Sequence, residues 1–327
     1  MDYAKRIKEL RESTGLSRKE FSLHVGIPVR TLEDWEAGRR KPPEYLPRLI
    51  AYQLKYEKLL QGMSGKLLAV GGTADIYDLG NGKVFKRFHE DKPEYCIENE
   101  IECTSSEVAV SLGAPKVYER VNDERGRGII MEYVSGQSML EEMFLKGTAF
   151  DIEKNAEEMA KLQYKINSFD GTMFPKGHDV MRERILQSGY LDDTTKAKLL
   201  KLLETLPQGN GVCHSDMHPG NIIVTENGFR VIDWCDTMCD SVWLDVARTL
   251  LIFESVSEMS GVNTEDLNKS RYAWKTYYRT AFEKLAGKSE EELEGWMAVV
   301  AAMRLAEERP ENHPWMMGRI KRAVDGI

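Results

Sequence analysis

The chain has 327 residues, and its 53 acidic and 45 basic side chains give a formal net charge of −8 at pH 7. No stretch approaches the length of a membrane helix and no apolar signal region opens the chain, so we expect a cytoplasmic protein, in a bacterium. The 5 cysteines are an odd number without a Cys-x-x-Cys pair. We therefore expect buried, reduced thiols in preference to a zinc site at Cys235 and Cys239.

Charge is divided unevenly along the chain. Residues 1–60 hold 13 Lys and Arg against 9 Asp and Glu, whereas the remainder holds 32 against 44. A basic segment joined to an acidic one fits a DNA contact on one side of the molecule only. The excess of basic residues is modest, so a homodimer that spans two half-sites is a further hypothesis.

The first sixty residues predict a series of short helices. Ala4–Ser13 carries apolar residues at helical spacing. Ser17 starts a second helix, where Glu20 completes a capping box. Gly26 gives a tight turn, and a third helix covers Val29–Glu36. Helix, glycine turn and helix together are typical of a helix-turn-helix.

Residues 16–42 resemble the Cro/C1-type (Xre-like) DNA-binding family, including the ending Trp35-Glu36-x-Gly38-Arg39-Arg40-x-Pro42. The resemblance implies double-stranded DNA as a partner of a domain at residues 1–62. It places Val29, Arg30 and Asp34 at base edges, where Asp34 either accepts from cytosine or holds Arg30 in place. It also implies phosphate contacts from Arg18, Arg39, Arg40 and Lys41. The alternative is a small helical bundle used for dimerisation or docking.

A second domain follows the sequence Gly62-Met63-Ser64-Gly65, which we interpret as a joint. Lys66–Val70, Ile76–Leu79 and Lys83–Phe88 read as three strands, with Gly71 and Gly72 in the first turn and Asn81-Gly82 as a hairpin signal. Glycines allow backbone amides to approach phosphate closely, although most Gly-Gly pairs are only turns.

A long helix and a further strand are expected next. Pro93 to Leu112 reads as one helix, because proline stands near its start and Gly113 lies just past its end. Gly128–Val134 reads as a strand that leads into a hinge.

The sequence from His214 to Asn221 is the most informative in the chain. It holds Asp216 and, five residues later, Asn221, and an apolar hairpin then leads to Asp233. Two carboxylates and a carboxamide at these separations are the minimal set for phosphoryl transfer in a kinase-like site. A surface loop that carries two acids by chance is the alternative, and the Pro219-Gly220 pair and the hairpin weigh against it.

This sequence is similar to the catalytic loop of protein kinases. The run His218-Pro219-Gly220 and Ile232-Asp233-Trp234 resemble the aminoglycoside phosphotransferase and choline kinase superfamily. The resemblance implies an α+β protein: an all-α helix-turn-helix domain followed by a bilobal protein kinase-like phosphotransferase fold. Its N-lobe would cover residues 66–135 and its C-lobe, with a helical substrate-binding region, residues 136–327.

The same resemblance implies ATP and Mg²⁺ as cofactors and assigns roles to individual residues. Asp216 would orient the acceptor hydroxyl, and Asn221 and Asp233 would hold Mg²⁺. Glu100 would hold the lysine that contacts the phosphates. The residues that would contact the nucleotide itself are Gly71, Gly72, Lys86, Glu132, Tyr133 and Val134. Glu100 is the expected partner of Lys86, with Glu102 as the alternative because counting back from Gly113 favours it.

Three further residues have expected roles near the loop. His214 is expected to be a scaffold residue and not a base, while the role of His218 is open. Asp245 is expected to brace the loop through backbone amides. The altered sequence Cys239-Asp240-Ser241, where the family has Gly-Asp-Pro, is expected to change a turn and not the chemistry.

The resemblance leaves the acceptor open. The expected acceptor is a small molecule with a hydroxyl group, such as an aminoglycoside, choline or a sugar. Acids in the C-lobe would suit a polycation, although most are expected to be a solvated face: Glu254, Glu258, Glu265, Asp266, Glu290, Glu291, Glu292, Glu294, Glu307 and Glu308. The alternatives are a nucleotide- or ligand-sensing transcriptional regulator with little turnover, and a protein kinase of a toxin–antitoxin pair.

Overall fold

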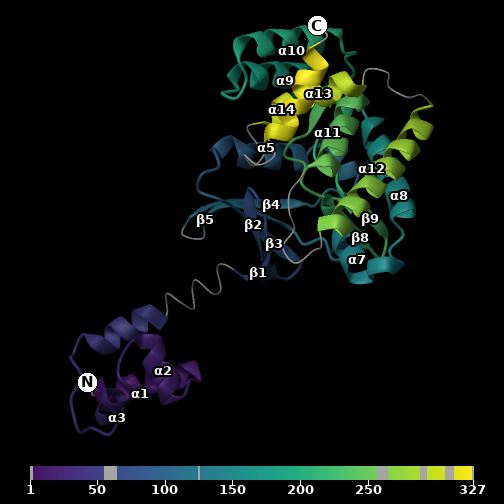
Figure 1. Cartoon of the computed structure of the whole chain (residues 1–327). Coiled ribbons are helices and arrows are strands. Elements are labelled where there is room, and N and C mark those ends of the chain that lie inside the picture. Colours follow the sequence, from purple (N-terminus) through teal and green to yellow (C-terminus); the bar gives the residue numbers. More distant parts are fainter. Residues whose placement is uncertain are drawn as a thin grey trace.

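The computed structural model describes residues 3–54, 65–123, 126–255, 264–287, 293–305 and 313–325. Figure 1 shows three groups of elements: N-terminal helices, an antiparallel sheet with two short helices, and a larger, mainly helical region. The predicted mixture of helix and sheet is therefore confirmed. The predicted joint at residues 62–65 lies, except for Gly65, outside the described residues.

The N-terminal helices lie where the sequence predicts them. They are α1 (Tyr3–Thr14), α2 (Arg18–Val25) and α3 (Val29–Glu36), and residues 46–54 are helical as well. The Ser17 side chain accepts from the amide of Glu20, whose carboxylate accepts from the amide of Ser17, so the capping box is present. The helices share a separate apolar core of Ile7, Leu10, Phe21, Leu32 and Ile50.

A five-stranded antiparallel sheet follows, with the strand order β1-β2-β3-β5-β4. Its strands are β1 (Lys66–Val70), β2 (Ala74–Gly80), β3 (Lys83–Phe88), β4 (Val117–Asp123) and β5 (Gly126–Glu132). Asn81 and Gly82 both have left-handed backbone, with φ of 52° and 71°. This is the conformation that the predicted Asn-Gly hairpin requires.

The helix predicted from Pro93 to Leu112 is two helices. α5 covers Glu94–Thr104 and α6 covers Glu107–Ser111. The break has a local cause, because the Ser106 side chain accepts from the amide of Ala109 and so caps a new helix. Ser106 also donates to the carbonyl of Cys103, which ends the preceding helix.

The third group of elements contains two small sheets. β6 (Gln137–Ser138), β8 (Ile222–Thr225) and β9 (Gly228–Val231) form one, and β7 (Gly211–Cys213) pairs with β10 (Met238–Asp240) in the other. The pairing of β8 with β9 is the predicted apolar hairpin, with Ile222 opposite Val231. The sheets therefore bring the two ends of this hairpin, at Asn221 and Asp233, close together.

Helices surround these small sheets. They are α7 (Met139–Lys146), α8 (Ile152–Asn167), α9 (Gly177–Gln187), α10 (Asp193–Thr205), α11 (Val242–Glu254), α12 (Thr264–Ala286), α13 (Leu293–Arg304) and α14 (His313–Val324). The short 3₁₀ turns Gly147–Ala149 and Pro219–Asn221 complete the set. Among the helices described, none has the length and apolar character needed to cross a membrane.

The largest apolar core lies in this helical region and includes Trp234, Trp243 and Trp296. All five cysteines have free thiols, and three of them are buried. Cys235 Sγ lies 3.4 Å from an oxygen of Asp233, whereas Cys239 Sγ accepts from the ammonium of Lys176 at 3.3 Å. The two thiols therefore contact different groups.

A buried ion pair joins α9 to β10. Nδ1 of His178 lies 2.7 Å from Oδ2 of Asp240, and Nε2 lies 3.3 Å from the carbonyl oxygen of Leu206. Both ring nitrogens face acceptors, which favours the doubly protonated ring. Burial alone would lower the pKa of His178, but the hydrogen bond and charge of Asp240 outweigh it, and the pKa is raised.

The stability of the fold should depend on pH through His178. A raised pKa contributes stability that is fully present below about pH 6.5, the unfolded value, and is lost as pH rises through the folded pKa. We expect the free energy of unfolding of wild type to decline as pH rises from about 6.5 through the folded pKa of His178. His178→Gln should remove the pH dependence that comes from this histidine. Urea unfolding measures the change between about pH 5.5 and about pH 8.5, a range that includes the unfolded pKa of about 6.5. An unchanged slope in the variant would contradict the assignment.

Candidate active site

The loop between β7 and β8 is held by a buried carboxylate of α11. Asp245 accepts from the amides of His214 at 3.2 Å and Ser215 at 2.7 Å, and from the side-chain nitrogen of Asn167 at 2.8 Å. Ser215 has left-handed backbone, with φ of 67°, which costs free energy in a residue other than glycine. Asp245 therefore braces the loop through backbone amides, as the sequence predicts.

His214 packs the loop and does not point into an open site. Its Nδ1 accepts from the amide of Asp216 at 3.3 Å, and its Nε2 donates to the carbonyl of Ile232 at 3.2 Å. This pattern requires the neutral ring, and burial lowers the pKa of His214 accordingly. The ring packs edge-on against Trp234 at 4.9 Å. The expected scaffold role of His214 is what the contacts support.

Asp216 follows in the same loop and keeps 25% of its side chain exposed. Its Oδ2 accepts from Nδ2 of Asn221 at 3.0 Å and lies 3.6 Å from Nε2 of His218. Because Nδ1 of His218 accepts from the amide of Gly220 at 3.0 Å, the proton of the neutral ring is on Nε2 and faces Asp216.

The surroundings of Asp216 keep it ionised. Burial alone would raise its pKa, but the hydrogen bond from His218 and the charges of Arg248 and Arg304 lower the pKa well below the usual range. An ionised, partly exposed carboxylate held on both sides can accept a hydrogen bond from a hydroxyl group. Such a group suits an orienting role better than full proton removal, because its basicity is low.

Lys86 of β3 joins two carboxylates that come from different elements. Its ammonium lies 2.8 Å from Oε2 of Glu100 on α5 and 2.8 Å from Oδ1 of Asp233, which follows β9. Burial alone would lower the pKa of Lys86, but the charges of Asp233 and Glu100 outweigh it and raise the pKa well above its ordinary value. The predicted pair of Lys86 with Glu100 is confirmed, while Glu102 is exposed. The break after α5 explains why counting back from Gly113 pointed to the wrong acid.

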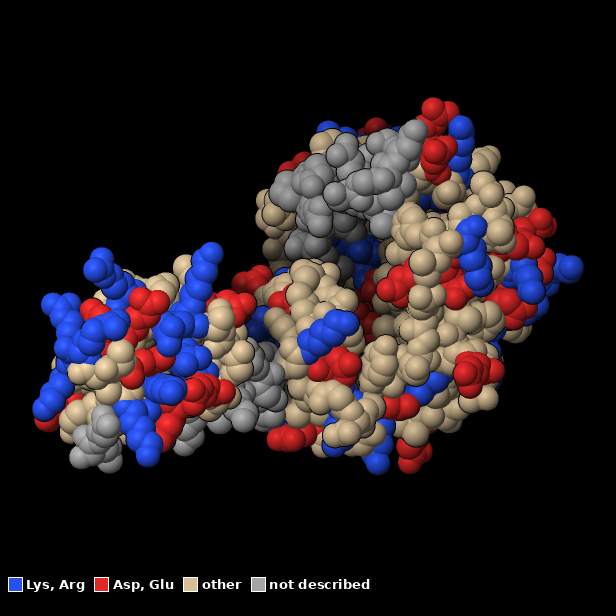
Figure 2. Space-filling model, turned by 90° about the horizontal axis from the view of Figure 1, so that it is seen from below, with Lys and Arg blue, Asp and Glu red and all other residues tan. Residues whose placement is uncertain are grey.

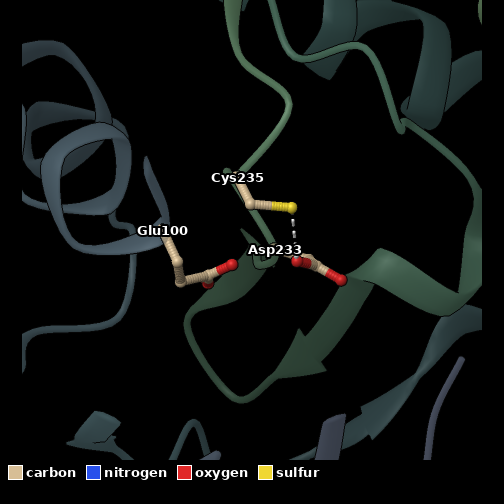
Figure 3. A group of neighbouring side chains, drawn as sticks. All are labelled: Glu100, Asp233 and Cys235. Atoms are coloured by element: carbon tan, nitrogen blue, oxygen red, sulfur yellow. Dashed lines mark hydrogen bonds between the residues drawn. The ribbon is translucent and has the colours of Figure 1, made fainter. Parts of the chain in front are cut away.

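Figure 3 shows Glu100 and Asp233 approaching each other from different elements, with the thiol of Cys235 beside Asp233. Asp233 has left-handed backbone with φ of 67°, and its side chain is 31% exposed. The amide of Ile232 donates to the carbonyl of Asn221 at 3.0 Å, which holds Asn221 near Asp233. The structure thus gathers the predicted site residues Lys86, Glu100, Asp216, Asn221 and Asp233.

The donor set of this cleft suits a hard divalent cation. Asp233 and Asn221 offer oxygen atoms, which Mg²⁺ prefers. Glu100 and Asp233 share the ammonium of Lys86. Burial raises the pKa of Glu100 to about 7, whereas at Asp233 burial is outweighed by the charge of Lys86 and the pKa is lowered, so Asp233 is the carboxylate that stays ionised. The thiol of Cys235 is a softer ligand, and burial raises its pKa well above the ordinary value, which disfavours its thiolate form.

The hinge and the glycine turn differ in part from expectation. The amides of Glu132 and Tyr133 donate to the carbonyls of Lys116 and Gly82 at 2.8 and 2.9 Å. The amide of Gly71 donates to the carbonyl of Ala74 at 3.0 Å and closes the turn. These three amides are therefore engaged within the sheet. Among the described residues, the amide of Val134 has no backbone partner, which leaves it as the candidate donor at the hinge.

The chain matches the model of a known protein family. The model of the phosphotransferase enzyme family (APH) matches residues 6–287. The chain belongs to this phosphotransferase family. The match starts within α1, so it includes the N-terminal helices. No curated protein matches the chain.

Solved structures of an aminoglycoside phosphotransferase share the fold at low sequence identity. Aminoglycoside phosphotransferase APH(4)-Ia is 16% identical, with a TM-score of 0.57, over 84% of this chain and 98% of that chain. A thermostable mutant of the same enzyme, in ternary complex with AMP-PNP and hygromycin B, is 16% identical, with a TM-score of 0.54, over 79% and 92%. A choline/ethanolamine kinase family protein from Mesorhizobium loti is 15% identical, with a TM-score of 0.48, over 81% and 88%.

Two of the predicted phosphate-contacting residues are engaged inside the N-terminal helices. Glu36 is 4% exposed and pairs with both Arg11 and Arg18 at 2.8 Å. Arg39 pairs with Asp34 at 2.8 Å. The predicted phosphate contacts of Arg18 and Arg39 thus compete with partners inside the protein. The turn between α2 and α3 brings Glu36 within reach of Arg18. Asp34, by contrast, lies on α3, and Arg39 follows the end of the same helix.

The other predicted DNA contacts lie at the surface. Arg30, Arg40 and Lys41 are exposed and Val29 is half-buried. Lys and Arg side chains project from the N-terminal helices on the face seen in Figure 2, with acidic side chains between them. A hollow among these helices is lined by Lys8, Arg18, Glu33, Glu36, Ala37 and Arg39.

The predicted acidic face of the C-lobe is largely paired where it is described. Glu254 contacts Lys275 at 2.5 Å and Arg319 at 2.6 Å, and Arg319 also contacts Glu294. Glu265 pairs with Lys269. The predictions for Glu258, Glu290, Glu291, Glu292, Glu307 and Glu308 lie outside the described residues.

Sequence reasoning missed two arginines of the site. Nε of Arg248 on α11 donates to the carbonyl of Ser215 at 2.5 Å, and Arg230 on β9 contacts the hinge residue Glu132. Their partners are 33 and 98 residues away along the chain. No local pattern signals such contacts, because they depend on how distant elements pack.

The brace at Asp245 can be tested by an isosteric change. Asp245→Asn places an N–H group against the donors of His214, Ser215 or Asn167, so we expect the free energy of unfolding to fall by about 3 kcal/mol. Urea unfolding followed by circular dichroism measures this change. The exposed Asp266→Asn on α12 is the matched control and should leave the midpoint unchanged. Equal midpoints for both variants would contradict the bracing role.

Proposed function

We propose that this protein is a kinase that transfers the γ-phosphoryl group of ATP to a hydroxyl group of a small molecule. The observation that carries the proposal is the approach of Lys86 on β3 and of Asp233 after β9 to the loop that holds Asp216 and Asn221. Membership of the phosphotransferase family supports the reaction class. The complex of a related fold with AMP-PNP and hygromycin B supports a nucleotide and a hydroxylated small molecule as its two substrates.

ATP and Mg²⁺ are the cofactors of the proposed reaction. Lys86 would contact the phosphates, and Asp233 with Asn221 would hold Mg²⁺, which neutralises phosphate charge when it is bound. Gly71 and Gly72 would cover the phosphates at the turn between β1 and β2. Adenine would contact the hinge near Glu132, Tyr133 and Val134, with the amide of Val134 as donor.

Asp216 would orient the acceptor hydroxyl for in-line attack. A bond forms between the hydroxyl oxygen and the γ-phosphorus while the bond from that phosphorus to the β-phosphate oxygen breaks, with ADP as the leaving group. The hydroxyl proton passes along its hydrogen bond to Asp216 and then to solvent as the new ester forms. The transition state is loose, so little proton transfer is needed before the bond to the leaving group lengthens. An ionised carboxylate of low basicity fits this requirement, and Asn221 and His218 keep it in position.

We infer in addition that residues 1–62 bind double-stranded DNA. The α2–Gly26–α3 arrangement and the exposed Arg30, Arg40 and Lys41 support this. Arg30 would meet a guanine edge, and Arg40 and Lys41 would meet phosphates. A homodimer would place two such surfaces on adjacent half-sites.

The nature of the acceptor can be separated from two alternatives in one assay. The purified protein is incubated with MgATP and a panel of hydroxylated amines, sugars and antibiotics, and ADP release is followed. Turnover that depends on a small acceptor supports the proposal. Phosphate transferred to a protein favours a toxin–antitoxin-type kinase, and nucleotide binding without turnover favours a regulator.

Asp216→Asn should abolish transfer while nucleotide still binds. Loss of the carboxylate removes the group that orients the hydroxyl, so we expect turnover to fall by at least about a hundredfold. Binding of AMP-PNP with Mg²⁺, measured by calorimetry, should remain. Asp193→Asn, at the exposed start of α10, is the control. A variant at position 216 that turns over as fast as wild type would show that the catalytic assignment is wrong.

Arg30→Ala should weaken specific DNA binding. Loss of a bidentate contact to guanine costs about 1–3 kcal/mol and relaxes specificity at one base position, whereas Lys41→Ala should weaken binding to all sequences about equally. Footprinting on DNA upstream of the protein's own gene identifies a site, and fluorescence anisotropy then measures affinity. The exposed Lys154→Ala on α8 is the control. DNA affinity that is the same for Arg30→Ala and wild type would argue against base contact by α3.

A further inference from the structure

Arg230 connects the strand that leads to Asp233 with the hinge. On β9, its Nη1 and Nη2 donate to the two carboxylate oxygens of Glu132, at 2.5 and 2.9 Å. The same guanidinium donates through Nε to the carbonyl of Gly113 at 2.7 Å and through Nη2 to that of Ala114 at 3.2 Å. One side chain thus contacts the end of β5 and the segment after α6.

The Glu132 carboxylate is itself fixed on the other side. Its Oε2 also accepts from the backbone amide of Lys116 at 3.1 Å. The hydrogen bonds from Arg230 lower the pKa of Glu132, and burial opposes them only in part. Both side chains are about one-quarter to one-third exposed, at 27% and 30%. The pair is therefore ionised, bidentate and partly shielded from water, which is the geometry in which an ion pair is most specific.

We propose that Arg230 is a positioning residue that fixes the distance between the adenine-contacting hinge and Asp233. This inference rests on the proposed function. Arg230 lies three residues before Asp233, with Val231 in the ladder to β8 and the amide of Ile232 bonded to Asn221. At the other end, Glu132 lies two residues before Val134, the candidate donor to adenine. One guanidinium therefore couples the two ends of a bound nucleotide, its base and its phosphates.

The contact requires arginine and not only a positive charge. The planar guanidinium carries five N–H donors in a fixed arrangement, and here it serves a carboxylate and two carbonyls at once. A lysine ammonium has three donors and cannot present two parallel bonds to a carboxylate. Arg230→Lys should therefore restore function only in part, whereas a role that depended on charge alone would be restored fully.

The test compares nucleotide binding among matched variants. The probe is AMP-PNP with Mg²⁺, and binding to the full chain is measured by calorimetry. We expect Arg230→Gln to weaken binding about tenfold, which corresponds to about 1.4 kcal/mol, and Arg230→Lys to lie between this variant and wild type. The control is Arg120→Gln on β4 of the same sheet, which removes exposed pairs with Glu94 and Glu98 of α5 and should bind as wild type. Wild-type affinity in Arg230→Gln would overturn the inference.

Two further measurements separate a positioning role from a structural one. Glu132→Gln should weaken binding like Arg230→Gln, and the double variant should be no worse than either single variant, because both act through one contact. Once an acceptor is known, the KM for ATP should rise in Arg230→Gln while the KM for the acceptor stays constant. Additive effects, or equal changes in both KM values, would contradict the role.

Hydrogen exchange tests the coupling without nucleotide. Arg230→Gln should increase exchange both at the hinge, residues 132–134, and at residues 231–234, whereas Arg120→Gln should change neither. Increased exchange at only one of the two segments would overturn the coupling. If wild type itself does not bind AMP-PNP, the proposed function fails, while the exchange data still decide whether Arg230 joins the two segments.

Discussion

Two carboxylates that share one buried ammonium form the constraint on which the rest of the cleft depends. Lys86 is held between Glu100 and Asp233 at equal distances of 2.8 Å. Transfer of each of these ions out of water costs several kcal/mol, which is offset only while all three remain together. The sheet, the helix α5 and the strand β9 must therefore meet at this point. Asp233, which keeps 31% of its side chain exposed, is the carboxylate of the pair that can reach a divalent cation.

A second buried carboxylate, Asp245, holds the loop between β7 and β8 that carries Asp216. Asp245 fixes two consecutive backbone amides, and Arg248, one turn further along α11, donates to the carbonyl of Ser215. One helix thereby satisfies both the donors and the acceptor of the loop. The side chain of Asp216 can remain partly exposed because these contacts fix the backbone of the residues before it. Its ionised state follows from the hydrogen bond with His218 and the charges of Arg248 and Arg304.

Local patterns in the sequence predicted much of this site, whereas contacts between distant elements did not follow from them. The Asn81-Gly82 turn set the hairpin that places Lys86, and resemblance to a family suggested Glu100 as its partner. The helix break at Ser106 was missed, because a serine within a helical pattern gives no sign whether it will cap a new helix. The pairing of Arg18 with Glu36 was missed for a different reason. It depends on the angle between α2 and α3, which no spacing in the sequence reveals.

Left-handed backbone at Ser215 and Asp233 has a consequence for how this protein can change. Glycine would adopt both conformations without steric cost, and asparagine would adopt them more readily than serine. Substitutions that remove the backbone strain at these positions should raise the free energy of unfolding and lower the rate of turnover. The loss of turnover should be most severe at Asp233, where the carboxylate itself would be lost. Selection for thermal stability and selection for turnover would therefore favour different residues at these two positions.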